Sequence, residues 1–166
     1  MIGGWECRND CPPAAARWYM VRLTRTSAPW AFARGEPFRT VASLELFASL
    51  VSLMAFGDSL GAEDEAELQI TGLTDNRGNV FALSRLMSSK FPLVLILSEF
   101  ASQLRTRRLG MSLRWIPRGQ NEEADALTNG QTGASTPVAG WMWTWKGCPG
   151  WFSPKWPKLQ TNYTLK

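Results

Sequence analysis

A run with helical periodicity in the middle of the chain, residues 40–56, constrains the fold more than any other feature of the sequence. Its apolar residues recur at the spacing of one buried helical face, and Gly57 supplies a stop signal. The predicted apolar stripe consists of Leu44, Phe47, Ala48, Val51, Met54 and Ala55. Strand-like segments precede and follow this helix, so the succession of elements predicts a mixed α/β layer.

Strand and helix signals fill most of the first 129 residues. Extended segments are expected at residues 2–7, 17–24, 68–74 and 111–116. Further helices are expected at residues 79–88, 92–108 and 121–127. The strand at 68–74 is predicted to be buried, and the candidate core residues of the helix after it are Phe81, Leu83 and Leu86. The chain therefore has the length and the pattern of one domain with additional segments.

The pattern changes after residue 129. Residues 130–166 contain five of the nine tryptophans among Gly, Pro, Ser and Lys, without an amphipathic partner segment. Trp141, Trp143 and Trp145 alternate with other residues, so an edge strand or a base-stacking surface is an alternative to a loosely packed appendage. We interpret residues 1–129 as the domain and residues 130–166 as the appendage, whose deletion should leave thermal stability nearly unchanged.

The net charge of +4 does not identify a binding surface on the domain. It equals the charge of the lysines that follow the last acidic residue, namely Lys146, Lys155, Lys158 and Lys166. Basic and acidic residues balance before that point, so basicity indicates nothing about the partners of the domain.

The absence of histidine excludes several classes of active site. Ser-His-Asp and Cys-His catalysis need an imidazole, and three cysteines alone do not complete a four-ligand structural zinc site. Carboxylates remain as the carriers of acid-base or metal chemistry. We interpret the acid-rich residues 57–67 as a solvated linker, because consecutive like charges repel one another.

No segment has the length of a transmembrane helix. The longest strongly apolar run, residues 91–97, is far shorter than the roughly 20 residues that span a bilayer, and the first residues do not resemble a signal peptide. We therefore expect an intracellular protein of the cytoplasm or nucleus that is not secreted and has no membrane partner.

Three acidic residues stand at positions where an open α/β sheet collects functional groups. Glu45 lies on the long helix, Asp75 directly follows a strand, and Asp125 lies on the last predicted helix. Groups at strand ends and on adjoining helices converge over one edge of such a sheet. Taken singly, each also has a structural interpretation. Glu45 would be a residue of a polar helix face, Asp75 a turn or cap residue, and Asp125 a solvated helix residue.

The sequence contexts of these three residues are more informative than the residues alone. Glu45 lies in Ser-Leu-Glu-Leu-Phe-Ala, Asp75 in Leu-Thr-Asp-Asn, and Asp125 in Arg-Trp-Ile-Pro-Arg-Gly-Gln-Asn-Glu-Glu-Ala-Asp-Ala-Leu. The chain here resembles the ribonuclease H domain of retroelement reverse transcriptases, where Trp-(Val/Ile)-Pro-Arg leads into Asn-x-x-Ala-Asp-x-Leu on the last helix. The resemblance covers about residues 1–129.

This resemblance implies a ribonuclease H-like mixed sheet of five strands flanked by helices. It also implies an endonuclease that cleaves the RNA strand of an RNA–DNA hybrid with two Mg²⁺ ions. Glu45, Asp75 and Asp125 would be the catalytic metal ligands. The residue types agree, because Mg²⁺ prefers oxygen ligands and two ions can activate the attacking water and stabilise the leaving oxygen.

The same resemblance suggests roles for four further residues. Asn121, one helical turn before Asp125, would support a ligand or face the substrate. The residues that would contact phosphates are Asn76, Arg77 and Arg118. A solvent-facing role in turns is an equal alternative for these three.

One expected element of the family has no counterpart. The family carries a fourth carboxylate, an Asp at the end of a first, central strand before the turn into Ile-Gly-Gly-Trp, and Met1 lies within that turn. Glu6 and Asp10 fall in or after the next strand, so neither matches. We therefore expect an amino-terminally truncated domain without the first central strand, and little ribonuclease activity from the chain alone.

Three functions remain open from the sequence. The first is a ribonuclease H domain, complete or completed by another chain, that cleaves RNA–DNA hybrids. The second is a noncatalytic module that binds nucleic acid or another partner, and the third is a degenerate retroelement fragment. The sequence does not give the oligomeric state.

Overall fold

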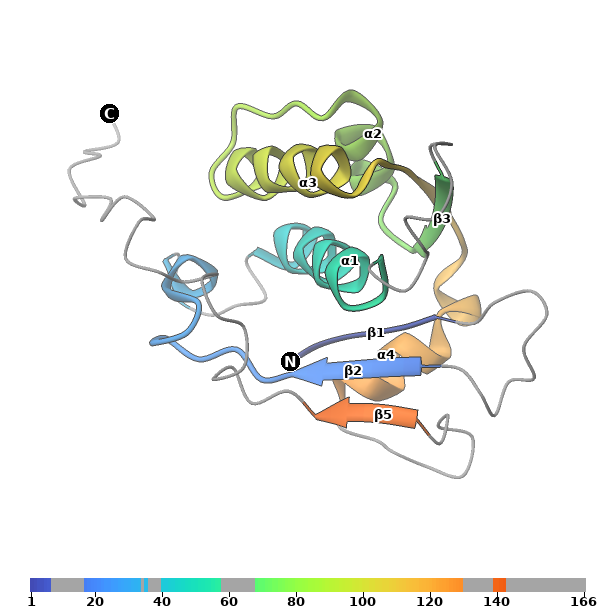
Figure 1. The fold of residues 1–166 in the computed structure, drawn as a ribbon. Coiled ribbons are helices and arrows are strands. Elements are labelled where there is room, and N and C mark those ends of the chain that lie inside the picture. Colours follow the sequence, from blue (N-terminus) through green and yellow to red (C-terminus); the bar gives the residue numbers. More distant parts are fainter. Residues whose placement is uncertain (7–16, 34, 36–39, 58–67, 130–138, 143–166) are drawn as a thin grey trace.

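Helix α1 (Val41–Gly57) lies between a small sheet and helix α3 (Leu93–Arg107) at the centre of the structure (Figure 1). A computed structural model of the chain describes residues 1–6, 17–33, 35, 40–57, 68–129 and 139–142. The other helices are α2 (Arg77–Arg85) and α4 (Glu122–Thr128), and 3-10 turns occupy Pro29–Phe32 and Arg118–Gln120. The prediction of a mixed α/β class is confirmed.

The strands form two separate sheets within these ranges. One contains β1 (Ile2–Glu6), β2 (Arg17–Val21) and β5 (Ala139–Met142), and β2 pairs antiparallel with β1 and parallel with β5. The other contains β3 (Leu68–Thr74) and β4 (Leu109–Trp115), which pair in parallel. Among the described strands, none pairs with the second side of β1 or of β3.

The buried side of α1 differs from the predicted stripe. Of the predicted residues only Phe47 is buried, and the others are half-buried. The buried apolar side chains of α1 are Leu46, Phe47, Leu50, Leu53 and Phe56. Because α1 contacts β1, α2 and α3, it is covered on more than one side, and its apolar spacing does not mark a single face.

The three-stranded sheet packs closely against α1 through Gly4 and Tyr19, which are paired across β1 and β2. Tyr19 is 1% exposed, and its hydroxyl donates a hydrogen bond of 2.5 Å to the Ala48 carbonyl oxygen on α1. A Cβ atom on Gly4 would lie 2.6 Å from Ser52 Oγ and 2.8 Å from the Tyr19 ring. Glycine therefore allows this strand to approach the helix.

Within the described part of the chain, the helices pack on one face of the β3–β4 pair. Strand β4 contacts α2 and α3, and its Leu109 and Leu113 belong to the core. The side chains exposed on the other face are Gln69, Thr71, Leu73, Ser112 and Arg114. The strand at 68–74 was predicted to be buried with Ile70 inside, and this holds only in part: Ile70 is partly buried on the packed face, but Leu73 is 53% exposed on the other.

Helix α2 begins earlier than predicted, and only part of its predicted core is buried. Asn76 caps it, because the Asn76 side-chain oxygen accepts a hydrogen bond of 3.3 Å from the Asn79 backbone N–H. Leu83 is 2% exposed, as predicted, whereas Phe81 is 64% exposed and Leu86 42%. Phe81 is two residues from Leu83 and so points away from it. Leu86 follows the last helical residue in a left-handed conformation, with φ of 47°.

Four residues of the segment 130–166 belong to a sheet. Ala139–Met142 form β5 beside β2, whereas the sequence favoured a loosely packed appendage. Backbone groups at the edge of β2 make this pairing possible without an amphipathic pattern. The rest of this segment, like the acid-rich residues 58–67, lies outside the described ranges. No helix in the described part of the chain is long and apolar enough to cross a membrane.

Candidate carboxylate site

Helix α1 places Glu45 at the edge of the core. Its neighbour Leu46 is fully buried, whereas Glu45 is half-buried. Glu45 Oε2 accepts a hydrogen bond of 2.8 Å from Asn76 Nδ2 and a longer one of 3.5 Å from Asn79 Nδ2. Asn79 is 2% exposed and also donates to the Ala42 carbonyl oxygen at 3.0 Å. Two asparagines at the start of α2 therefore hold the Glu45 carboxylate.

The surroundings of Glu45 raise its pKa above the usual value for a glutamate. Burial is the main cause, because desolvation disfavours the charged form. The hydrogen bond from Asn76 and the positive charge of Arg118 lower the pKa, whereas repulsion by Asp75 and by Asp125 raises it. The carboxylates of Asp75, at the end of β3, and of Asp125, on α4, therefore lie close enough for their charges to act on Glu45.

Hydrogen bonds fix the backbone of Asp75 and Asn76 in the turn between β3 and α2. The Thr74 carbonyl oxygen accepts a hydrogen bond of 2.9 Å from the Ile116 N–H, which extends the pairing of β3 with β4. The Thr74 hydroxyl accepts one of 3.2 Å from the Asn76 N–H. The Asp75 carbonyl oxygen accepts one of 3.1 Å from the Trp115 indole N–H. The turn is thus fixed by both strands of the pair, and the Asp75 side chain is half-buried.

Helix α4 presents Asp125 together with a cation. Arg118 Nε lies 3.5 Å from Asp125 Oδ2, and the two side chains are 80% and 41% exposed. Water screens so exposed a pair, so its contribution to stability is small. Asn121 directly precedes the helix, and its carbonyl oxygen accepts a hydrogen bond of 3.1 Å from the Asp125 N–H. Arg118 neutralises Asp125 here, and its contact with a phosphate stays a prediction.

Two contacts of the site were not expected from the sequence. One is the hydrogen bond from Asn79 to Glu45. The other joins Arg77 to Trp115, with the guanidinium carbon 4.1 Å from the ring centroid. Both contacts join residues far apart along the chain, so local patterns carried no signal for the pairing, although Trp115 is the tryptophan of the Trp-Ile-Pro-Arg motif.

The donor atoms of the site suit a hard divalent cation, but the described side chains do not form a closed ligand set. Carboxylate oxygens are the preferred ligands of Mg²⁺, and a cation would relieve the repulsion at Glu45. Within the ranges that the structure describes, no three His, Cys, Asp or Glu side chains lie close enough to hold a metal ion. Asp75 and Asp125 thus each lie within electrostatic range of Glu45, without the three carboxylates forming a coordination sphere.

Comparison with known proteins provides no family for this chain. No family model matches it, and neither the curated proteins nor the solved structures give a match. The class that the molecule itself shows is a mixed α/β protein with interacting carboxylates at the carboxyl end of a parallel strand pair.

Proposed function

We propose that residues 1–129 are a ribonuclease H-like domain from a retroelement reverse transcriptase, built for Mg²⁺-dependent hydrolysis of RNA in RNA–DNA hybrids. The observation that carries this proposal is the interaction of Glu45 with Asp75 and Asp125, which come from three different elements. A half-buried carboxylate repelled by two others is typical of functional sites. The sequence resemblance centres on the same three residues.

The residues of the chain have distinct roles in this proposal. Glu45, Asp75 and Asp125 would hold Mg²⁺, which supplies an activated water and stabilises the leaving oxygen. Asn76 orients Glu45 by donating to it, and Arg118 balances the charge of Asp125 until a cation replaces it. Only ionised Glu45 is a ligand, so its raised pKa predicts metal affinity that increases with pH.

We also propose that the chain alone is an incomplete nuclease. The resemblance implies a fourth carboxylate on a first, central strand, and among the described strands none pairs with the second side of β1 or of β3. Metal positions must be tight for in-line attack, and a displacement of about 1 Å costs on the order of 100-fold in rate. Three carboxylates without a closed ligand set therefore predict weak metal binding and little or no cleavage.

One observation favours a second function, a noncatalytic module that binds nucleic acid. Arg77 is exposed beside the turn that carries Asp75, and its guanidinium carbon lies over the Trp115 ring. An exposed arginine at this place would bind a backbone phosphate without a metal.

The test compares the full chain with two variants, Asp125→Asn and Glu122→Gln. Both remove one negative charge from α4, but Glu122 is not among the charges that act on Glu45. Mn²⁺ binding is measured by electron paramagnetic resonance, and cleavage is measured on an RNA–DNA hybrid with Mg²⁺ or Mn²⁺. We expect weak Mn²⁺ binding that Asp125→Asn reduces and Glu122→Gln retains, with little or no cleavage.

Two results would overturn parts of this proposal. Cleavage by the natural chain that Asp125→Asn abolishes would refute its incompleteness. Metal binding that is absent, or equal in both variants, would refute the carboxylate site and leave the noncatalytic module. A chain extended by a strand that ends in Asp provides the complementary test, because it should gain cleavage.

A further inference from the structure

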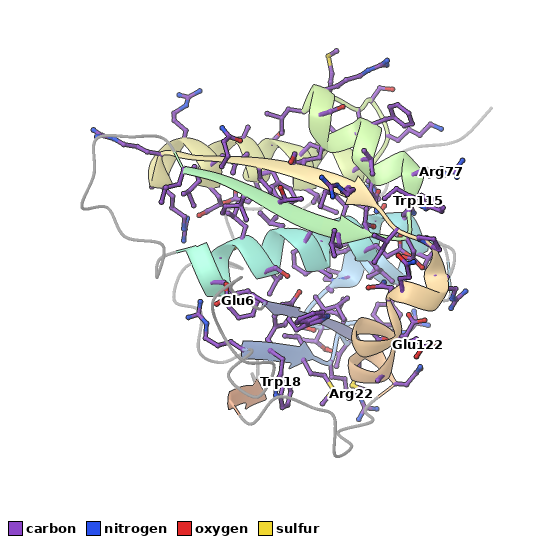
Figure 2. All side chains as sticks on the ribbon, turned by 90° about the vertical axis from the view of Figure 1, so that its right-hand side faces the viewer. Glu6, Trp18, Arg22, Arg77, Trp115 and Glu122 are labelled. Carbon is purple, nitrogen blue, oxygen red and sulfur yellow. The ribbon has the colours of Figure 1, made fainter. Side chains whose placement is uncertain are left out.

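Arg77 and Trp115 form a contact at the rim of the carboxylate site. Arg77 is the first residue of α2 and Trp115 the last of β4, and Figure 2 shows their side chains together at the same end of the strand pair. The Arg77 guanidinium carbon lies over the indole ring, 4.1 Å from its centroid. At this distance the ring attracts the cation and restricts its orientation.

The ring itself is fixed by the turn that carries the candidate ligand Asp75. The Trp115 indole N–H donates a hydrogen bond of 3.1 Å to the Asp75 carbonyl oxygen. The pairing of β3 with β4 also places Trp115 beside this turn, because Thr74 lies opposite Trp115. The position of the Arg77 guanidinium is therefore tied, through the ring, to the position of Asp75.

Among the described residues, no acidic partner uses the donors of Arg77. Arg77 is exposed, and among the described residues no carboxylate lies within ion-pair distance of it. This distinguishes it from Arg118, which is paired with Asp125. A guanidinium whose carbon lies over an aromatic face keeps N–H groups at its edge, and such groups bind the oxygens of a phosphate in pairs.

We propose that Arg77, positioned by Trp115, binds a backbone phosphate of the nucleic-acid strand that lies over the carboxylate site. This inference rests on the proposed function and adds a substrate contact to it. The recognised group is a phosphodiester, so binding is independent of base sequence. Trp115 is a positioning residue that acts through Arg77.

The experiment measures binding of a fluorescently labelled RNA–DNA hybrid to the full chain by anisotropy, in EDTA, as a function of salt. EDTA removes the contribution of any divalent cation, so failure of the carboxylate site does not affect the result. Arg77→Ala should weaken binding about equally for hybrids of different sequence and reduce the salt slope by about one. Arg77→Lys keeps the charge, so it should weaken binding while nearly retaining the slope.

Arg85 provides the matched control, because it is an exposed arginine at the other end of α2. Arg85→Ala should leave affinity and salt slope close to those of the natural chain. Equal losses in Arg77→Ala and Arg85→Ala would show general charge attraction and overturn the proposal. Affinity and slope unchanged in Arg77→Ala would overturn it as well.

A double-mutant cycle tests the role of Trp115. Trp115→Leu should weaken binding in the natural background and have little further effect in Arg77→Ala, because it acts through that arginine. A general loss of structure would instead weaken binding in both backgrounds and refute the positioning role. Trp115→Phe keeps an aromatic face and should recover part of the affinity.

Inorganic phosphate at constant ionic strength distinguishes a polynucleotide from a free anion. Displacement of the hybrid by low millimolar phosphate in the natural chain, but not in Arg77→Ala, would show a site for free phosphate and overturn the assignment to a polynucleotide. Absence of competition supports it. If Arg77→Ala binds normally while Asp125→Asn loses Mn²⁺, this inference fails and the proposed function stands.

Discussion

The two sheets of this protein differ in how tightly they pack against the helices. The β1–β2–β5 sheet is packed tightly against α1, where Tyr19 is 1% exposed and Gly4 leaves no room for a Cβ atom. The β3–β4 pair packs on one face, leaves Leu73 53% exposed on the other, and ends in the turn that carries Asp75. The first sheet is joined closely to the central helix, whereas the second also positions polar groups at its end.

The largest expected difference between the sheets is the response to an added methyl group. Gly4→Ala places a Cβ atom against Ser52 Oγ and the buried Tyr19 ring, which should cost about 2 kcal/mol by overpacking. Gly72→Ala meets only the ends of the Leu113 and Met111 side chains, which can move, so it should stay within about 0.5 kcal/mol. Urea unfolding gives both values. Equal losses of unfolding free energy in Gly4→Ala and Gly72→Ala would contradict this difference between the sheets.

A smaller effect is expected from the hydroxyl that joins the first sheet to α1. Tyr19→Phe removes the hydrogen bond to the Ala48 carbonyl oxygen and should cost about 1 kcal/mol in unfolding free energy. Ser112→Ala removes a hydroxyl from the exposed face of β4 and should change stability by less than about 0.5 kcal/mol. If calorimetry found Tyr19→Phe as stable as the natural chain, the tight contact with α1 would not stabilise the fold.

The smallest expected effect is a gain in unfolding free energy, and it comes from a substitution in the carboxylate site. Because the pKa of Glu45 is raised in the folded state, the folded chain loses stability as pH rises through the unfolded and then the folded pKa. Glu45→Gln should therefore raise the unfolding free energy at pH 7 and lose this advantage at pH values below the usual glutamate pKa. We expect about 0.5 kcal/mol, since solvent screens a half-buried carboxylate.

Glu99→Gln serves as the control, because it removes one negative charge from α3, where Glu99 accepts a hydrogen bond from Gln103. This change should alter stability by less than about 0.5 kcal/mol. Thermal melts at several pH values provide the comparison. A Glu45→Gln variant that is less stable than the natural chain at pH 7 would show that the ionised carboxylate stabilises the fold.

Local patterns predicted where the elements lie but not which sides they bury. Residues 68–74 form a strand as expected, because β-favouring residues end at a turn signal. The face of α1 could not be predicted from periodicity, because that helix is covered on several sides. Phe81 illustrates the same limit, since the helix spacing does not reveal that α2 leaves it 64% exposed.

The sequence likewise predicted only part of the candidate site. Glu45, Asp75 and Asp125 were singled out from their positions on elements and from their sequence contexts, and the structure places them within electrostatic range. The contacts of Asn79 with Glu45 and of Trp115 with Arg77 carried no such signal, because they are tertiary, although Trp115 itself belongs to the motif that carries the resemblance. Whether the three carboxylates are metal ligands stays a prediction.

The most direct test of the central claim is the pKa of Glu45, measured by carbon-13 NMR of its carboxyl group. The carboxylate site predicts a pKa above the usual glutamate value, a decrease in Asp75→Asn and in Asp125→Asn, and a decrease when Mg²⁺ is added. Glu122→Gln, on the same helix as Asp125, should leave the pKa of Glu45 unchanged. A pKa at the usual value, or one that neither aspartate substitution alters, would contradict the existence of a shared carboxylate site.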